Sequence, residues 1–177
     1  MDNLWLDSAF YQAKRAVGNT GKNPAVGCVI VKNNMIIGVG HTSKNGRPHA
    51  EENALSMAGK KSIGATLYVT LEPCNKEDNV NSCTNQILNA GIKEVVYSMH
   101  DPNIEIYKKG ISTLKKAGIK TKIINPSFNN FLINYGHYCY HKNKRPTFTI
   151  KIGSSVDSKI TFSNGKSKWI TSDLARR

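Results

Sequence analysis

Short runs of β-branched and aliphatic residues alternate with segments of helical periodicity along most of the 177-residue chain. The predicted strands are residues 25–32, 35–41, 65–72, 93–99 and 119–125, and the predicted helices are residues 6–17, 49–59, 83–91, 109–118 and 126–142. Asn33 and Asn34 separate the first two strands and favour a tight antiparallel hairpin. Helices between the later strands favour parallel pairing. The sequence therefore predicts an α/β fold, a three-layer α/β/α sandwich around a mixed, partly parallel five-stranded sheet.

Composition and charge narrow the classes of function. No apolar run is long enough to span a membrane, and the acidic, amphipathic N-terminus does not resemble a secretion signal, so a cytoplasmic location is expected. Without such a signal, four cysteines disfavour a disulfide scaffold. The net charge of +13 comes mostly from lysines scattered along the chain. This scatter disfavours a dedicated nucleic-acid surface, although the charge would attract a phosphorylated small substrate.

Four residues at predicted strand–helix junctions have the types and order of a zinc site. His49 and Glu51 begin the helix before the third strand, Cys74 follows that strand, and Cys83 begins the next helix. His49, Cys74 and Cys83 would give zinc three protein ligands and leave a fourth position open, as in catalytic sites. Glu51 would then take a proton from water and hand it to a leaving amine. His-x-Glu followed by Pro-Cys and a further cysteine is the signature of zinc deaminases.

Several longer blocks resemble the deaminase domain of the bifunctional riboflavin-biosynthesis deaminase/reductase, whose fold is cytidine deaminase-like. The matching blocks, in order, are NPAVGCVIV, GRPHAE, GATLYVTLEPC, AGIKEVVYSMHDPN and GISTLKKAGI, and the likeness covers nearly the whole chain. Eight residues separate Cys74 from Cys83, as in that family. In transfer-RNA and cytidine deaminases of the superfamily the gap is typically two residues, so the spacing argues against a nucleic-acid deaminase.

The resemblance implies a reaction and a set of substrate contacts. The family uses zinc to remove the pyrimidine amino group of 2,5-diamino-6-ribosylamino-4(3H)-pyrimidinone 5′-phosphate, with Glu51 as the proton shuttle. The positions that match its substrate-facing residues are Asn23, Thr42, Asp101 and Asn103. Lys76 is expected to supply a cation for the phosphate, because the family's basic residue between the cysteines is replaced by Asn79. The alternative for Lys76 is an ordinary solvated lysine.

Departures from the family pattern keep other functions open. The loop 75–82 and the turn 104–109 differ from the family, whereas the zinc ligands and Glu51 are retained. One alternative is a zinc deaminase of another small amino-pyrimidine or nucleotide. The other is a non-catalytic relative kept for binding or assembly, against which the retention of Glu51 argues. The expected assembly is a homo-oligomer.

The end of the chain resembles a different domain. Residues 1–145 are expected to form the zinc-dependent deaminase domain, and residues 146–177 resemble the opening of the family's reductase domain. About thirty residues cannot build a dinucleotide-binding domain, which needs several strand–helix units. No reductase activity is therefore expected from this chain, and the reductase step would come from a separate chain.

Overall fold

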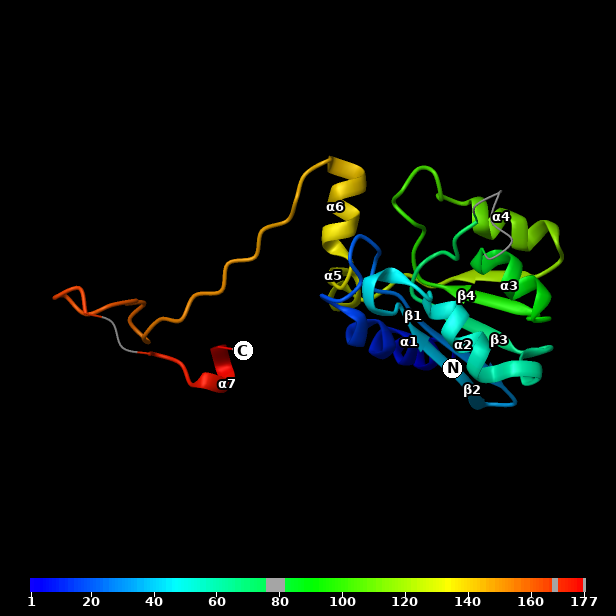
Figure 1. Ribbon diagram of the computed structural model, residues 1–177, viewed down its shortest axis with the longest axis horizontal. Coiled ribbons are helices and arrows are strands. Elements are labelled where there is room, and N and C mark those ends of the chain that lie inside the picture. Colours follow the sequence, from blue (N-terminus) through cyan, green and yellow to red (C-terminus); the bar gives the residue numbers. More distant parts are fainter. Residues whose placement is uncertain (76–81, 167–168, 177) are drawn as a thin grey trace. The chain divides into compact units, whose positions relative to one another are not determined.

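The computed structural model describes residues 1–75, 82–166 and 169–176 (Figure 1). The chain divides into two compact units, Met1–Pro146 and Thr147–Arg177. Within these described residues, the first unit contains the sheet and six α-helices, and the second contains the short helix α7 (Asp173–Arg176). In the described part of the chain, no helix combines the length and the apolar character that crossing a bilayer would require. The assignment of the second unit to the start of a reductase domain stays a prediction.

Five strands form one mixed sheet in the first unit. They are β1 (Gly27–Lys32), β2 (Met35–His41), β3 (Thr66–Val69), β4 (Glu94–Tyr97) and β5 (Lys120–Ile123), in the spatial order β2-β1-β3-β4-β5. Strand β1 pairs antiparallel with both β2 and β3, whereas β3, β4 and β5 are parallel. Asn33 and Asn34 both have positive φ, as the predicted tight hairpin between β1 and β2 requires. The predicted mixed, partly parallel sheet is confirmed.

Helices cover both faces of this sheet, which confirms the three layers. The helices of the first unit are α1 (Asp2–Ala16), α2 (Ala50–Ala58), α3 (Cys83–Asn89), α4 (Lys109–Lys116), α5 (Phe128–Leu132) and α6 (Tyr135–Asn143). Leu6 and Phe10 of α1 pack with Val29 of β1 on one face. Helices α2, α3 and α4 pack on the opposite face. The central strands β1, β3 and β4 are thereby buried on both sides, as their near-continuous apolar sequences predict.

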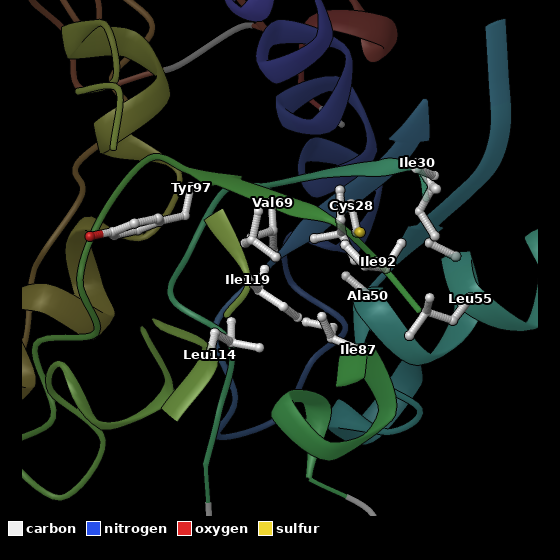
Figure 2. Packing of buried hydrophobic residues seen from close by; sticks show 14 of the residues in the cluster. Cys28, Ile30, Ala50, Leu55, Val69, Ile87, Ile92, Tyr97, Leu114 and Ile119 are labelled. Carbon is white, nitrogen blue, oxygen red and sulfur yellow. The ribbon is translucent and has the colours of Figure 1, made fainter. Parts of the chain in front are cut away.

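Strand β1 shows how one short sequence supplies both cores. Successive side chains of a strand point to opposite faces. Cys28 and Ile30 therefore lie in the core under α2 and α3, whereas Val29 and Val31 lie in the core under α1. Figure 2 shows Cys28 and Ile30 in one cluster with Ala50 and Leu55 of α2. Cys28 is completely buried, so its thiol is part of the hydrophobic core.

Glycines on β2 allow α2 to lie directly against the sheet. A Cβ atom at Gly40 would lie 2.2 Å from the backbone oxygen of Ala50 and 2.7 Å from the backbone nitrogen of Ala54. A Cβ atom at Gly38 would likewise lie 2.3 Å from the oxygen of Ala54. No side chain fits between these backbones. Because α2 begins directly after His49, this packing also sets the position of the predicted zinc ligand.

The prediction of one long helix over residues 126–142 is wrong. The segment forms two helices, α5 and α6, with a break at Ile133 and Asn134. At the break the Asn134 side chain accepts a hydrogen bond from the Ala25 amide and donates one to the Ala25 carbonyl, both at 2.8 Å. These two bonds satisfy a buried backbone segment and favour the break over a continuous helix. Pro126 precedes Ser127, the N-cap of α5, instead of lying within the first turn.

Replacing Gly40 by alanine should destabilise the first unit. The added methyl group meets backbone atoms of α2, which cannot move aside as a flexible side chain would. We expect the free energy of unfolding to fall by about 1–3 kcal/mol, the usual scale of overpacking. Urea titration followed by circular dichroism measures the change. Ser56→Ala, on the exposed side of the same helix, is the control and should leave the midpoint nearly unchanged. A Gly40→Ala midpoint equal to wild type would show that α2 does not need this close contact.

Candidate metal centre and active site

The imidazole of His49 and the thiols of Cys74 and Cys83 form one cluster. Nδ1 of His49 lies 3.2 Å from the sulfur of Cys83 and 3.7 Å from the sulfur of Cys74. The three ligand atoms all lie within 4.8 Å of one another. Zinc bound tetrahedrally at its usual bond lengths holds N and S ligands about 3.5–3.8 Å apart. The predicted ligands are therefore brought together in an arrangement that fits a zinc ion, with one tetrahedral position left over.

Each ligand lies at the end of a regular element. His49 is the N-cap of α2, and Cys83 is the first residue of α3, whose N-cap is Ser82. Cys74 follows the carboxyl end of β3. Backbone N–H groups at a helix N-terminus favour a nearby thiolate. The start of α3 thus favours the thiolate form that Cys83 adopts when it binds a metal.

Two hydrogen bonds join the segments that bear the cysteines. The carbonyl of Cys74 accepts from the hydroxyl of Thr84 at 2.8 Å and from the Thr84 amide at 3.2 Å. Thr84 is completely buried and directly follows Cys83. The loop after β3 is thereby fastened to the first turn of α3. This contact holds the two thiols close together although eight residues separate them in the sequence.

Glu52 joins the two helix starts from the other side. Its carboxylate accepts a 2.6 Å hydrogen bond from the His49 amide and a 3.1 Å bond from the side-chain amide of Gln86 on α3. Arg47 lies 3.2 Å from the same carboxylate. A carboxylate at the third helical position that caps the N-cap amide is one half of a capping box. Glu52 therefore ties the start of α2, and with it His49, to α3.

The cysteines differ in protonation because they hydrogen-bond each other. The Cys83 thiol, followed by His49, stabilises the Cys74 thiolate and lowers the pKa of Cys74 to about 4, against the effect of burial. The hydrogen bond to Cys74 and burial raise the pKa of Cys83. The hydrogen bond with Cys74 also raises the pKa of His49. The Cys74 thiol therefore ionises more readily than the Cys83 thiol.

Glu51 is a buried carboxyl group beside this cluster. It lies in the first turn of α2 and is 3% exposed. Burial, followed by the Cys74 thiolate, raises the pKa of Glu51 to about 7, and His49 opposes the shift. A group with a pKa near neutrality can both accept and release a proton, as general acid–base catalysis requires.

A cavity of about 60 Å³ opens onto the cluster. Its lining includes the predicted residues Asn23, Thr42, His49, Glu51, Cys74 and Asp101. These residues come from positions as far apart as 23 and 101 in the chain. The fold therefore gathers most of the predicted site around one small hollow. Lys76 lies outside the described residues, and its contact with a phosphate stays a prediction.

The loop that carries Asn23 depends on a glycine. The Asn23 carbonyl accepts a hydrogen bond from the Thr20 hydroxyl at 2.5 Å. A Cβ atom at Gly46, whose φ is +98°, would lie 1.9 Å from the side-chain nitrogen of Asn23. Glycine at this position therefore lets the Asn23 amide occupy its place against the loop after β2.

The hydroxyl of Thr42 is engaged by the backbone. It accepts a hydrogen bond from the Val26 amide at 3.0 Å and donates one to the Pro24 carbonyl at 3.1 Å. Thr42 thus fastens the end of β2 to the segment before β1. Its predicted contact with a substrate stays a prediction, and any such contact would have to share this hydroxyl.

Asp101 and Asn103 differ in their relation to the cavity. Asp101 lines it, and Oδ1 of Asp101 accepts a 2.8 Å hydrogen bond from the Asn103 amide. The side-chain oxygen of Asn103 accepts from the Glu105 amide at 3.1 Å, as in an Asx turn. The described residues that line this cavity do not include Asn103. Asp101 therefore lies where a substrate contact is possible, and the contact of Asn103 stays a prediction.

Glu72 is a cavity residue to which the sequence reasoning assigned no role. Its side chain is completely buried and accepts hydrogen bonds from Nδ1 of His100 at 2.8 Å and from the Lys108 amide at 3.0 Å. The Ile111 amide donates to its other oxygen at 3.4 Å. Glu72 thus fixes the N-terminus of α4 beside the loop that carries Cys74. The sequence did offer a signal for Glu72, because a carboxylate at the end of a buried strand, two residues before a metal ligand, is expected to face the site.

Comparison with known proteins assigns residues 1–99 to one family model. That model describes the cytidine and deoxycytidylate deaminase zinc-binding region. The matched segment carries His49, Glu51, Cys74 and Cys83, so it contains the whole cluster and the adjacent carboxyl group.

The chain is similar to proteins of riboflavin biosynthesis over most or all of its length. The riboflavin biosynthesis protein RibD of Aquifex aeolicus is 40% identical over the full chain, which covers 50% of that protein. A diaminohydroxyphosphoribosylamino-pyrimidine deaminase of Buchnera aphidicola is 45% identical over 69% of the chain and 83% of its own length. A solved structure of Acinetobacter baumannii RibD is 40% identical and superposes with a TM-score of 0.87, over 99% of this chain and 49% of that one. The chain thus spans about half the length of the RibD relatives.

Removal of one thiol should release the metal. Purified protein should carry about one zinc ion per chain, and Cys83→Ser should lose most of it, because a site with three protein ligands depends on each of them. Inductively coupled plasma mass spectrometry measures the zinc content. Cys139→Ser is the matched control, since Cys139 is also buried but lies on α6, outside the cluster. Wild-type protein that contains no zinc after expression in zinc-supplemented medium would contradict the assignment.

Proposed function

The chain belongs to the cytidine and deoxycytidylate deaminase family of zinc-binding proteins, in its RibD branch, and we propose that it deaminates 2,5-diamino-6-ribosylamino-4(3H)-pyrimidinone 5′-phosphate by hydrolysis. One observation supports this proposal above the others. A buried carboxyl group, Glu51, lies beside a His-Cys-Cys cluster in a cavity, on a chain that is 45% identical to a protein named for this deamination.

The cluster would hold the cofactor. His49, Cys74 and Cys83 offer one nitrogen and two sulfur ligands, a donor set that suits zinc and leaves room for a further ligand. Zinc, when bound, supplies a Lewis acid that makes water a nucleophile near neutral pH. The protein keeps the three ligands in place through the Thr84–Cys74 hydrogen bonds and through Glu52.

Glu51 would move the protons of the reaction. Water adds to the ring carbon that bears the amino group, and Glu51 takes the proton that the water gives up. The same carboxyl group passes this proton to the ring nitrogen. It then takes the second proton from the added hydroxyl group and passes it to the amine, which leaves as ammonia while the ring C=O bond forms. Its buried place in the first turn of α2 supports this role, since a rigid helix start holds the carboxyl group at one position in the cavity.

The substrate contacts are proposed for residues that share the cavity. Asn23 and Asp101 offer an amide and a carboxylate on its wall, which suits the amino and hydroxyl groups of an amino-pyrimidine with a sugar attached. The net charge of +13 suits the phosphate of such a substrate.

We also assign residues 146–177 to the beginning of a reductase domain. The similarity to Acinetobacter baumannii RibD covers 99% of the chain and so extends into this segment. The sequence also retains the Trp169-Ile170-Thr171 block that resembles this domain.

An ammonia-release assay on a panel of substrates tests the proposal. Zinc-loaded protein is incubated with the diaminopyrimidine phosphate, its dephosphorylated form, cytidine and deoxycytidylate. The expected result is turnover of the phosphorylated diaminopyrimidine well above that of the other three compounds. A preference for another compound would show that the substrate is a different amino-pyrimidine. A zinc-loaded protein that is inert toward all four compounds would indicate a non-catalytic relative.

The substitution Glu51→Gln, which replaces the carboxyl group by an amide, distinguishes a role of Glu51 in proton transfer from a role in metal binding. It keeps the shape of the side chain but cannot accept a proton, so turnover should fall at least about a hundredfold while zinc content and folding are retained. Asp7→Asn, the same chemical change on the exposed side of α1, should leave turnover unchanged. Loss of zinc from Glu51→Gln would make Glu51 a ligand and contradict its role in proton transfer.

A further inference from the structure

Helix α6 brings a histidine to the carboxylate of Asp101. Nε2 of His137 lies 3.3 Å from Oδ1 of Asp101, and the two side chains are only 14% and 6% exposed. Because a carboxylate accepts hydrogen bonds, the imidazole is the donor in this contact. No motif links the two residues, which lie 36 positions apart.

The contact leaves one carboxylate oxygen of Asp101 available. In the described part of the chain, both recorded hydrogen bonds to this side chain go to Oδ1, one from His137 and one from the Asn103 amide. Asp101 also lines the cavity that contains Glu51 and the cluster. Two donors on one oxygen restrict rotation of the carboxylate, so the other oxygen can be presented in a fixed direction.

The position of His137 is set by the break between α5 and α6. Asn134, at the start of α6, is held by its two hydrogen bonds to Ala25. His137 lies one turn further along the helix, and its ring packs against that of His141 with centroids 4.5 Å apart. Figure 1 shows α5 and α6 beside the loop that follows α1. One short helix therefore contacts the site at two places, near Asn23 through Ala25 and at Asp101 through His137.

We propose that His137 is a positioning residue for the substrate cavity, which holds the Asp101 carboxylate in the orientation that a substrate hydroxyl or amino group requires. The inference rests on the proposed function in one respect, namely that Asp101 contacts the substrate. The hydrogen bond that His137 donates to Asp101 does not depend on the identity of the substrate and can be tested without any substrate.

The first test separates binding from chemistry. His137→Phe keeps an aromatic ring but removes the N–H donor, whereas His137→Gln retains a donor. We expect His137→Phe to raise KM for the diaminopyrimidine phosphate about tenfold, with a much smaller change in kcat, the scale of a hydrogen bond to a charged group. His137→Gln should recover most of the loss. Zinc content and melting temperature should stay close to wild type in both variants.

His141→Phe is the matched control. His141 lies on the same helix and packs against the same ring, so its replacement tests the packing of α6 without removing the donor to Asp101. We expect its KM to equal that of wild type. An unchanged KM in His137→Phe would overturn the proposal, as would equal losses in the Phe and Gln variants together with a lower melting temperature.

The second test needs no activity. The imidazole ¹⁵N resonances of His137, assigned by their loss in His137→Gln, report which ring nitrogen carries a proton. The proposal requires a proton on Nε2, and a neutral ring protonated at Nδ1 alone would overturn it. Wild-type protein that is inert toward the panel would instead refute the proposed function, and the ¹⁵N result would still decide whether His137 donates to Asp101.

Discussion

The direct contact between the backbones of α2 and β2 decides where the site can form. Gly38 and Gly40 leave no side chain between the two elements, so the backbone of α2 lies directly on β2, with its first residue, Ala50, against Gly40. His49 and Glu51 occupy those first residues. The cysteines can reach them only because Thr84 fastens the loop after β3 to α3 and because Glu52 joins α2 to α3. The metal centre is therefore a consequence of helix packing on this face of the sheet.

Three buried acids line one cavity, and their partners give them different properties. Glu72 receives hydrogen bonds on both oxygens, from His100 and from backbone amides at the start of α4, and so is held as part of the structure. Asp101 receives donors on Oδ1, from Asn103 and His137. Glu51 faces the thiolate of Cys74, and burial raises its pKa to about 7. A buried carboxylate is costly unless hydrogen bonds compensate for the lost water. At Glu51 the effect of burial outweighs that of its hydrogen bonds and of His49, so this acid is suited to exchange protons.

The substrate side of the cavity depends on segments that lie far from the metal ligands in the sequence. Asn134 holds Ala25 at the base of the Asn23 loop, and His137 holds Asp101. Both residues belong to the segment where one long helix was expected and two short ones are found. The break is thus part of the site, since Asn134, which lies at the break, binds the Ala25 backbone.

The sequence by itself determined the order of strands and helices, the mixed sheet and the metal ligands. These follow from local patterns: alternating apolar residues specify strand faces, and His49, Glu51, Cys74 and Cys83 occupy junctions that can be recognised from their neighbours. Only the tertiary structure decided the break before α6, the role of Glu72 and the contact of His137 with Asp101. Each of these rests on hydrogen bonds between residues 28 to 109 positions apart, as in Glu72 with His100 and Asn134 with Ala25. Local propensity carries no information about such partners, because burial of a polar side chain becomes favourable only after the fold has brought its partner within hydrogen-bonding distance.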